Sequence, residues 1–264
     1  MKKLIAILLT AICWQVSMAQ DDGPLYLLFE FMQVDNEQEA AYAETENFWE
    51  KIHQQSVQNG EKVGWDLWVL QPGGEIQNFQ YLTVNVYSDP VKMYEGGTLE
   101  SLVANAKKAY PNMSEDQIMK KIGNSSSTRD LAVRVYLSLD ETTDGDYDMT
   151  VGSISRINMM KTKPGQGANY VKAETEIFKP QHQKMVDAGQ RGSWGLASVM
   201  LPYGTEVYAD YYTFDMYKDY AQMLGEFNYQ GAQPTEEQQK AFQEIAETRD
   251  LKFSYIGKLL KKVR

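Results

Sequence analysis

Short apolar segments of strand length alternate with longer polar segments along the first half of the chain. The longer segments are rich in Glu, Gln and Ala, which favour helices, and the first of them ends at Gly60, a typical helix C-terminus. The Pro-Gly-Gly sequence at 72–74 marks a turn and predicts a hairpin. The expected strands are 25–34, 63–70, 78–87 and 129–139, and the expected helices are 37–59 and 91–122. The second helical region is expected to break near Tyr110-Pro111, and Ser114 with Gln117 marks a new helix start after the break.

The second half of the chain repeats the residue order of the first. Equivalent residues lie 128 to 130 positions apart: Glu46 matches Glu174, and Trp65 matches Trp194. So many identities in one order and near one offset indicate a tandem duplication of a unit of typical domain size. The expected strands of the second half are 151–161, 192–201, 206–217 and 249–259, and its expected helices are 166–188 and 218–247.

The element order in each half is βαββαβ, the order of ferredoxin-like units, so the predicted fold class is α+β. A four-stranded sheet with both helices on one face leaves its other face bare. We therefore expect the two bare faces to pack together into an intramolecular α/β barrel, an internal pseudo-dimer. The expected units are 20–140 and 150–264, joined by an acidic linker at 141–149 whose aspartates do not have the spacing of a calcium-binding EF-hand.

The repeated unit resembles that of the dimeric α/β-barrel superfamily. The likeness rests on an aromatic helix that carries Glu and His, on the Gly64-Trp65 strand and on the Pro-Gly-Gly turn, and it covers almost all of the chain after residue 19. Within the superfamily, the chain is most similar to NIPSNAP-like and EthD-like proteins and to uncharacterised exported bacterial members. The resemblance implies the fold but leaves function open, because the superfamily includes monooxygenases, haem-handling enzymes, isomerases and members without known activity.

Residues 1–19 have the features of a secretory signal peptide. Lys2 and Lys3 precede an apolar run, and Ser17 and Ala19 are the small residues that cleavage after Ala19 requires. The apolar run is too short to span a bilayer, and a retained anchor or a buried first helix is the alternative. We therefore expect an exported protein, periplasmic or extracellular, without a membrane span after cleavage.

Signal cleavage changes the charge and removes the only cysteine. The net charge of the 264-residue chain is −10, and loss of Lys2 and Lys3 makes it −12. Such an acidic surface repels phosphate backbones and predicts that nucleic acids are not partners. Because Cys13 leaves with the signal, the mature chain is expected to have no disulfide, thiolate nucleophile or cysteine metal site.

Strands 78–87 and 206–217 each alternate between an apolar face and a face rich in tyrosine. We expect the apolar faces to meet the helices as the dry core, and the tyrosine-rich faces to line a small-molecule cleft between the sheets or simply to fill the barrel. Glu30 and Arg156, on the first strands of the two halves, are candidates for an ion pair across the barrel, because strand-centre charges need partners. The expected lining is Phe79, Tyr81, Thr83, Asn85, Tyr87, Tyr211, Thr213, Asp215 and Tyr217, and the expected core is Leu82, Val84, Val86, Tyr212, Phe214 and Met216.

The chain has two histidines, and they fall at matching positions of the repeat. On the first helix, His53 shares a stripe with Tyr42, Glu46 and Trp49, where a carboxylate and an imidazole could act as an acid–base pair or bind a ligand. In the second half, His182 comes one residue too late for this stripe, a rotation of about 100°, so a bulge or kink is needed to restore it. A structural role for both histidines is the alternative.

Three functions stay open: binding of a small apolar or aromatic ligand between the sheets, a monooxygenase-like or haem-processing enzyme, and a purely structural envelope protein. The sequence has no phosphate loop, nucleophile elbow or metal-spaced motif, so we assign no catalytic residue, metal or cofactor. The resemblance implies that one histidine could be a haem ligand, although no haem-attachment motif is present. The candidate ligand-binding residues are Tyr42, Glu46, His53, Trp65, Tyr81, Asn85, Tyr87, Tyr170, Glu174, His182, Trp194, Tyr211, Asp215 and Tyr217.

Overall fold

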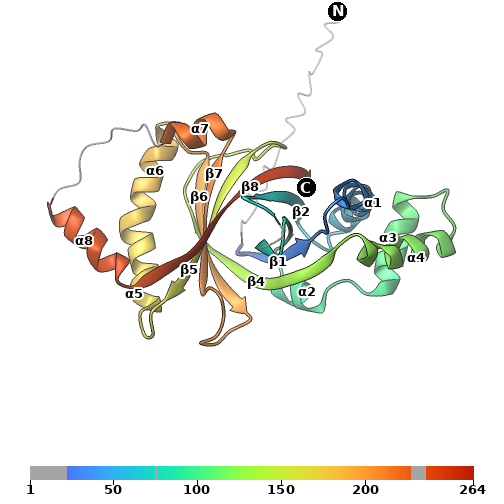
Figure 1. Ribbon diagram of the computed structural model, residues 1–264, viewed down its shortest axis with the longest axis horizontal. Helices are drawn as coiled ribbons and strands as arrows, with labels where there is room; N and C mark the ends of the chain where they lie inside the picture. The colour runs from blue at the N-terminus through green and yellow to red at the C-terminus, as the bar shows by residue number, and fades with distance from the viewer. Residues whose placement is uncertain (1–22, 75–76, 227–235) are drawn as a thin grey trace, which may run out of the picture.

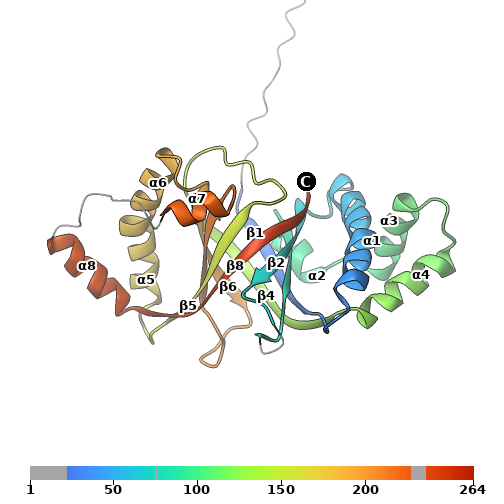
Figure 2. The ribbon, with the colours of Figure 1, turned by 45° about the horizontal axis from the view of Figure 1, so that its top comes forward.

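The computed structural model of the protein describes residues 23–74, 77–226 and 236–264. Eight strands form a central barrel, and helices lie on two opposite flanks of it (Figures 1 and 2). The expected signal peptide, residues 1–19, lies outside the described residues. No helix in the described ranges is long and apolar enough to cross a membrane.

The first half supplies four strands and the helices of one flank. The expected helix over 91–122 is divided into three helices. Gly96, with a φ of +63°, ends the first of them, and Ser114 and Gln117 form the capping box that starts the last. The elements are β1 (Leu25–Gln33), α1 (Glu39–Gln58), β2 (Gly64–Gln71), β3 (Tyr81–Tyr87), α2 (Pro90–Glu95), α3 (Leu99–Ala109), α4 (Glu115–Gly123), the 3₁₀ turn η2 (Asn124–Ser127) and β4 (Asp130–Thr142).

The second half supplies the other four strands and the opposite flank (Figure 2). Its first helix is interrupted by a π-helix, and the described part of its second helical region consists of two helices, α7 and α8. The elements are β5 (Ile154–Thr162), α5 (Gly167–Ala173), the π-helix η3 (Glu174–Phe178), α6 (Lys179–Asp187), β6 (Ser193–Leu201), β7 (Tyr211–Tyr217), α7 (Tyr220–Gly225), α8 (Glu236–Ala246) and β8 (Arg249–Val263).

The eight strands close into one antiparallel barrel in the order β1-β3-β2-β8-β5-β7-β6-β4. In each half the first strand lies between the third and the last. Two seams join the halves, β2 with β8 and β4 with β6. Closure pairs the edge strands of both halves, which would otherwise expose unpaired backbone groups. The chain therefore has a mixed α/β fold built on an eight-stranded antiparallel barrel.

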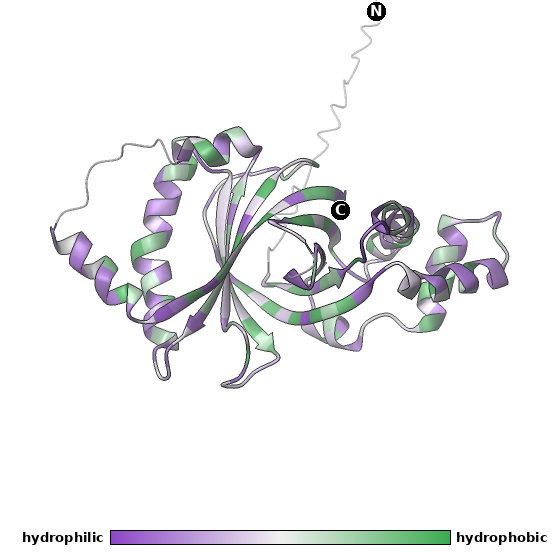
Figure 3. Cartoon of the chain, viewed as in Figure 1, coloured by the Kyte–Doolittle hydropathy of each residue, from purple (hydrophilic) through white to green (hydrophobic). Residues whose placement is uncertain are grey.

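The main apolar core lies inside the barrel, between the two sheets. Phe29 of β1 contacts the rings of Tyr212 and Phe214 on β7 across the interior, with ring centroids 5.8 and 5.7 Å apart. The helices outside mix hydrophilic and hydrophobic residues, as Figure 3 shows. Burial of apolar surface between the sheets is thus the main force that holds the two halves together. The buried residues of this core include Leu27, Phe31, Trp68, Leu70, Leu82, Val84, Val86, Ile157, Met159 and Leu259.

The predicted orientation of β3 and β7 is therefore wrong. Leu82, Val84 and Val86 point into the barrel, because the driest layer of the molecule lies between the sheets. The undersides of the helices carry groups such as His53, which need polar partners on the sheet. Phe79, which precedes β3, does lie in the barrel. The residues that lie under the helices instead of between the sheets are Tyr81, Thr83, Asn85, Tyr87, Tyr211, Thr213, Asp215 and Tyr217.

Candidate functional site

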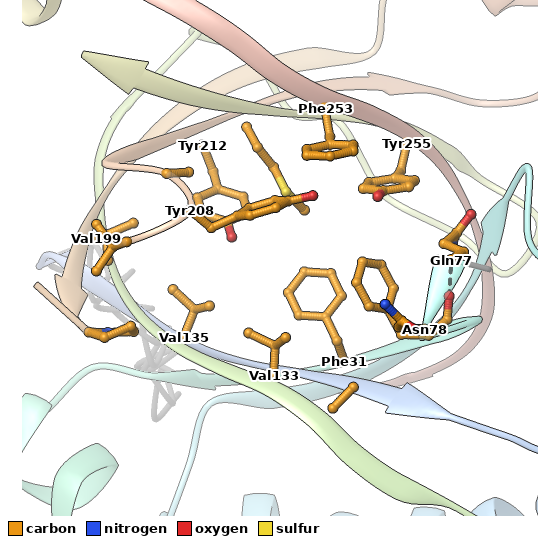
Figure 4. A pocket seen from close by; sticks show the side chains of 16 residues that line it. Phe31, Gln77, Asn78, Val133, Val135, Val199, Tyr208, Tyr212, Phe253 and Tyr255 are labelled. Carbon is orange, nitrogen blue, oxygen red and sulfur yellow. Dashed lines mark hydrogen bonds between the residues drawn. The ribbon is translucent and has the colours of Figure 1, made fainter. Parts of the chain in front are cut away.

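One end of the barrel holds a pocket of about 490 Å³ between the two sheets, which we call the barrel-end pocket (Figure 4). The ring centroids of Phe31 and Phe79 in the first half lie 4.8 Å apart, and the ring centroid of Phe79 lies 5.5 Å from that of Tyr255 in the second half. Both halves therefore contribute to its wall. The other lining residues are Gln77, Asn78, Ala132, Val133, Val135, Met159, Val199, Pro202, Val207, Tyr208, Ala209, Tyr212 and Phe253.

Phenolic hydroxyls supply much of the polarity of the barrel-end pocket. Tyr208, Tyr212 and Tyr255 line it, and no described lining residue is charged. Burial raises the pKa of Tyr208 and of Tyr212 above the ordinary value for tyrosine, because apolar surroundings disfavour the phenolate. The hydroxyls of Tyr208 and Tyr212 are therefore neutral at pH 7 and able to donate or accept a hydrogen bond.

The sequence predicted a possible cleft between the sheets, but of the residues that line the barrel-end pocket it placed only Phe79 in that cleft and named none among the ligand-binding candidates. A usable signal lies in β8, where Phe253 and Tyr255 alternate with the exposed polar residues Lys252 and Ser254. Applied to the last strand, the alternation argument places two aromatic rings on one face. Only the barrel topology then shows that this face meets the other sheet.

In the first half, His53 lies in a polar layer between α1 and the sheet. Its imidazole stacks on the indole of Trp65, with ring centroids 4.7 Å apart and planes at 25°. Lys62 places Nζ 3.2 Å from His53 Nδ1 and donates a hydrogen bond of 2.6 Å to Oδ1 of Asn85. The same ammonium lies 5.8 Å from the ring centroid of Tyr87. The structure therefore brings four predicted candidates together around a lysine that the prediction did not include.

The second half repeats this layer with stronger charges. His182 stacks on Trp194, with centroids 4.9 Å apart and planes at 19°. One nitrogen of the Arg191 guanidinium lies 2.6 Å from His182 Nδ1 and 2.5 Å from Oδ1 of Asp215. Arginine and aspartate thus occupy the places of lysine and asparagine in the first half, and they form a buried ion pair.

Glu226, directly after α7, completes the layer of the second half. Its carboxylate accepts a 2.6 Å hydrogen bond from Arg191 and another from the hydroxyl of Tyr217. Arg156 lies 3.9 Å from the carboxylates of both Asp215 and Glu226. Two arginines and two carboxylates therefore balance one another, and Arg191 is only 3% exposed.

The bulge that the late position of His182 requires is present as the π-helix η3. Glu46 and His53 are seven positions apart, whereas Glu174 and His182 are eight positions apart. A π-turn is wider than an α-turn and absorbs one extra residue. His182 therefore reaches the same face as His53, and each imidazole stacks on the equivalent tryptophan.

Both imidazoles are neutral in the folded protein. Burial, helped by the adjacent cation, lowers the pKa of His53 well below the usual histidine value and the pKa of His182 to about 3. Since Lys62 and Arg191 can only donate, Nδ1 of each ring is the acceptor, and we assign the proton to Nε2. This geometry does not suit a general base, because the basic nitrogen is already occupied by a cation.

A second repeated cluster attaches the first helix of each half to its sheet. Glu46 on α1 is fully buried and forms an ion pair with Arg129, next to β4, so it does not pair with His53 as an acid–base couple. The Arg129 guanidinium lies 5.9 Å from the ring centroid of Tyr42, which contacts Tyr81 at 4.6 Å. These contacts are structural, since they fix α1 on the sheet. The equivalent residues of the second half are Tyr170, Glu174, Tyr211 and Arg249.

The expected ion pair across the barrel between Glu30 and Arg156 is not formed. Glu30 accepts a 2.6 Å hydrogen bond from Arg134 on the neighbouring strand β4. Arg156 lies near Asp215 on its own sheet. Both side chains lie on the helix side of their sheets, and the apolar core inside the barrel separates Glu30 from Arg156.

The site does not fit a histidine-bound haem, nor does the described structure offer a metal site. No group of three or more His, Cys, Asp or Glu side chains in the described ranges could hold a metal ion. No histidine lines the barrel-end pocket. His53 and His182 receive cations at Nδ1, whereas a metal-bound imidazole is normally supported by a carboxylate or carbonyl there.

The sequence matches no protein-family profile and no curated protein. The fold is similar to a putative monooxygenase from Fusobacterium nucleatum subsp. nucleatum (TM-score 0.58, 11% identity), covering 92% of this chain and 94% of the other. It is also similar to an anthrone oxidase-like protein, with a TM-score of 0.54 and 11% identity over 92% of this chain and 93% of the other. A putative monooxygenase from Lactobacillus acidophilus has a TM-score of 0.51 and 10% identity over 92% of this chain and 96% of the other. At these identities the likeness concerns the fold alone, which is that of the dimeric α/β-barrel proteins.

Proposed function

We propose that the protein binds a small apolar or aromatic molecule in the barrel-end pocket. The observation that carries this proposal is a space of about 490 Å³ walled by aromatic rings from both halves. This volume is within the range that small organic ligands occupy. A purely structural barrel is expected to fill its interior with its own side chains, so the pocket favours binding over a structural role.

The lining favours a flat, uncharged ligand with one or two polar substituents. Phe31, Phe79 and Phe253 offer ring faces and edges for stacking. The neutral hydroxyls of Tyr208 and Tyr212 can orient a carbonyl or hydroxyl group of the ligand. A charged ligand would lose its hydration here without gaining a charged partner among the described lining residues.

The uncharged dye N-phenyl-1-naphthylamine tests this proposal, because its fluorescence rises in apolar surroundings. We expect saturable binding to the wild-type protein and at least about tenfold weaker binding to Val133→Trp, whose indole would fill the pocket. Val133 is 41% exposed, so the larger ring is accommodated without overpacking the core. Leu251→Trp is the matched control, because Leu251 is exposed and does not line the pocket. Equal affinities of the wild type and Val133→Trp would exclude this pocket.

An oxygenase that acts in the same pocket is the second candidate. Two of the similar structures are named putative monooxygenases, and a third is named anthrone oxidase-like. The neutral tyrosine hydroxyls, placed beside an aromatic pocket, are the local feature that favours it. Anthrone is a suitable probe, because dioxygen converts it to anthraquinone and water with a change in absorbance. Binding without turnover supports the first proposal, whereas oxidation that Val133→Trp abolishes supports the second.

The origin and location of the protein belong to the same proposal. Duplication of a βαββαβ unit is supported by the equal strand order of the halves and by the paired imidazole–indole stacks. A NIPSNAP-like or EthD-like ancestry and export to the cell envelope stay predictions from the sequence. For export, we expect the protein expressed with residues 1–19 to have the mass of a chain that begins at Gln20. Recovery of the full-length chain from the cytosol would contradict it.

A further inference from the structure

We call the polar layers around His53 and His182 the two histidine layers. They differ at the residue that follows helix α2 in the first half and helix α7 in the second. Both helices have six residues and begin after an aspartate, Asp89 or Asp219, whose side chain accepts a backbone hydrogen bond. The residue directly after the helix is Gly96 in the first half and Glu226 in the second. The first half therefore lacks a side chain at the place where the second half has a carboxylate.

In the second half this carboxylate is the partner of a buried cation. Glu226 accepts hydrogen bonds from Arg191 and from the hydroxyl of Tyr217. The Arg191 guanidinium lies 5.8 Å from the ring centroid of Tyr217, and Lys62 lies at the same distance from the ring centroid of Tyr87. A cation and a tyrosine are thus placed alike in both halves, and only the second half supplies an anion between them.

The corresponding space in the first half is a crevice of about 460 Å³, which we call the α1–α3 crevice. Lys62, Tyr87 and His53 form its inner wall, and residues of α3 form the opposite side. No carboxylate of the described residues lies within ion-pair distance of Lys62 Nζ. The carboxylate of the neighbouring Glu61 instead accepts a 2.8 Å hydrogen bond from Nδ2 of Asn105. Burial lowers the pKa of Lys62 to about 8, as expected for a cation that lacks a direct counterion.

We propose that the α1–α3 crevice binds a small organic carboxylate, which takes between Lys62 and Tyr87 the place that Glu226 fills in the second half. This site is separate from the barrel-end pocket, since it lies on the opposite face of the sheet. Ile52 and Leu102 provide apolar contact for the body of the ligand, and Ser56 provides a hydroxyl. The crevice has two lysines, Lys62 and Lys92, and two glutamates, Glu61 and Glu95, in its lining. Because these charges cancel, a singly charged carboxylate is favoured over a phosphate dianion.

Propionate is the sharpest probe, because it has the structure of the missing glutamate side chain. Saturation-transfer NMR on the wild-type protein is expected to show millimolar binding of propionate and none of propionamide, which has the same shape without the charge. Inorganic phosphate is the competing anion. Competition by phosphate at concentrations equal to those of propionate would overturn the assignment to a carboxylate.

Variants of Lys62 locate the binding. Lys62→Met is expected to remove the propionate signal, whereas Lys62→Arg, which installs the cation of the second half, is expected to retain it. Lys107→Met is the control, since Lys107 pairs with Glu115 outside the crevice. Undiminished propionate binding by folded Lys62→Met would overturn the proposal, as would equal binding of propionamide by the wild type.

The second half offers a converse test. Glu226→Ala empties the place between Arg191 and Tyr217, so we expect the number of propionate sites to rise from one to two. Circular dichroism checks that this variant is folded, and Glu226→Gln, which keeps the volume filled, is expected to stay at one site. A folded Glu226→Ala variant with one site would mean that this arrangement of cation and tyrosine does not bind carboxylates, and would overturn the proposal.

Discussion

The two histidine layers have the same backbone framework and the same imidazole–indole stack, but they provide different partners for the buried cation. In the second half, Arg191 lies between the carboxylates of Asp215 and Glu226. In the first half, Lys62 has the neutral Asn85 as its hydrogen-bond acceptor and faces a crevice. The imidazole–indole stack is the same in both, so the stack belongs to the scaffold. The partner of the cation decides whether the layer is closed or open.

The charges are also distributed differently across the two sheets. The first half pairs Glu30 with Arg134 on neighbouring strands, whereas the second half has a neutral hydrogen bond of 2.7 Å from Ser254 to Asn158 at the same place. The second half instead concentrates its ion pairs around Arg191. The first half thus pairs charges on neighbouring strands where the second half is neutral, and the second half gathers carboxylates around Arg191 where the first half has the neutral Asn85 beside Lys62.

The largest expected effect separates the two cations. Arg191→Met leaves the buried carboxylates of Asp215 and Glu226 without their main partner, and we expect the free energy of unfolding to fall by about 3–5 kcal/mol. Lys62→Met removes the hydrogen bond that Lys62 donates to Asn85, but it leaves no directly contacting carboxylate without a partner. We therefore expect the free energy of unfolding to fall by only about 1 kcal/mol. Urea unfolding of both variants measures the difference. Equal losses would show that the two layers are energetically alike.

A smaller effect concerns acid stability, where the two halves should behave alike. Both histidines have a pKa below 6.5 in the folded protein, so the unfolded chain binds more protons as the pH falls below 6.5. Stability is therefore expected to fall on acidification, by up to about 1.4 kcal/mol per pH unit for each histidine. Glutamine keeps a hydrogen-bond acceptor but does not titrate in this range.

The double variant His53→Gln/His182→Gln is thus expected to lose stability less steeply than the wild type between pH 6.5 and 4.5. The two single variants should each remove about half of the difference. Unfolding curves at several pH values measure it. A single variant that accounts for the whole difference would show that only one imidazole is held neutral, and the two layers would then differ in their histidines as well.

The smallest expected effect concerns the π-helix. Deletion of the exposed residue Glu176 gives the second half the spacing of Glu46 and His53 in the first half. We expect the helix to become regular, His182 to stay stacked on Trp194, and the free energy of unfolding to change by less than about 1 kcal/mol. Urea unfolding followed by tryptophan fluorescence measures both effects. A loss of several kcal/mol would show that the wider turn itself is needed.

The sequence was sufficient to predict the order of the elements and the pairing of the histidines. Repeated identities at one offset predicted that His53 and His182 are equivalent. The one-residue excess showed that a bulge or kink would be needed to restore the stripe in the second half, and η3 provides it. The break in the helical region and the new start at Ser114 also followed from local capping chemistry. The elements and their caps depend on residues close together in the chain, and the equivalence of the histidines follows from comparison of the two halves, so neither requires knowledge of the tertiary contacts.

The orientation of the strands could not be predicted in the same way. Alternation shows that Leu82, Val84 and Val86 share a face, but it does not show which layer that face meets. Here both faces of β3 are mostly buried, and the polarity of the helix undersides decides the orientation. Lys62 was missed for a related reason, since a single lysine in a loop has no local signal and gains its role only from the long-range contact with Asn85.

The seams between β2 and β8 and between β4 and β6 have a consequence for how such a barrel can diverge. When two identical chains form a barrel, the symmetry of the pair places every substitution in both sheets. In this chain the two sheets have separate sequences. A residue such as Glu226 can close one layer while Gly96 leaves the other open, and the molecule can combine one flank whose buried cation is paired within the chain with one whose cation is free to meet a solute.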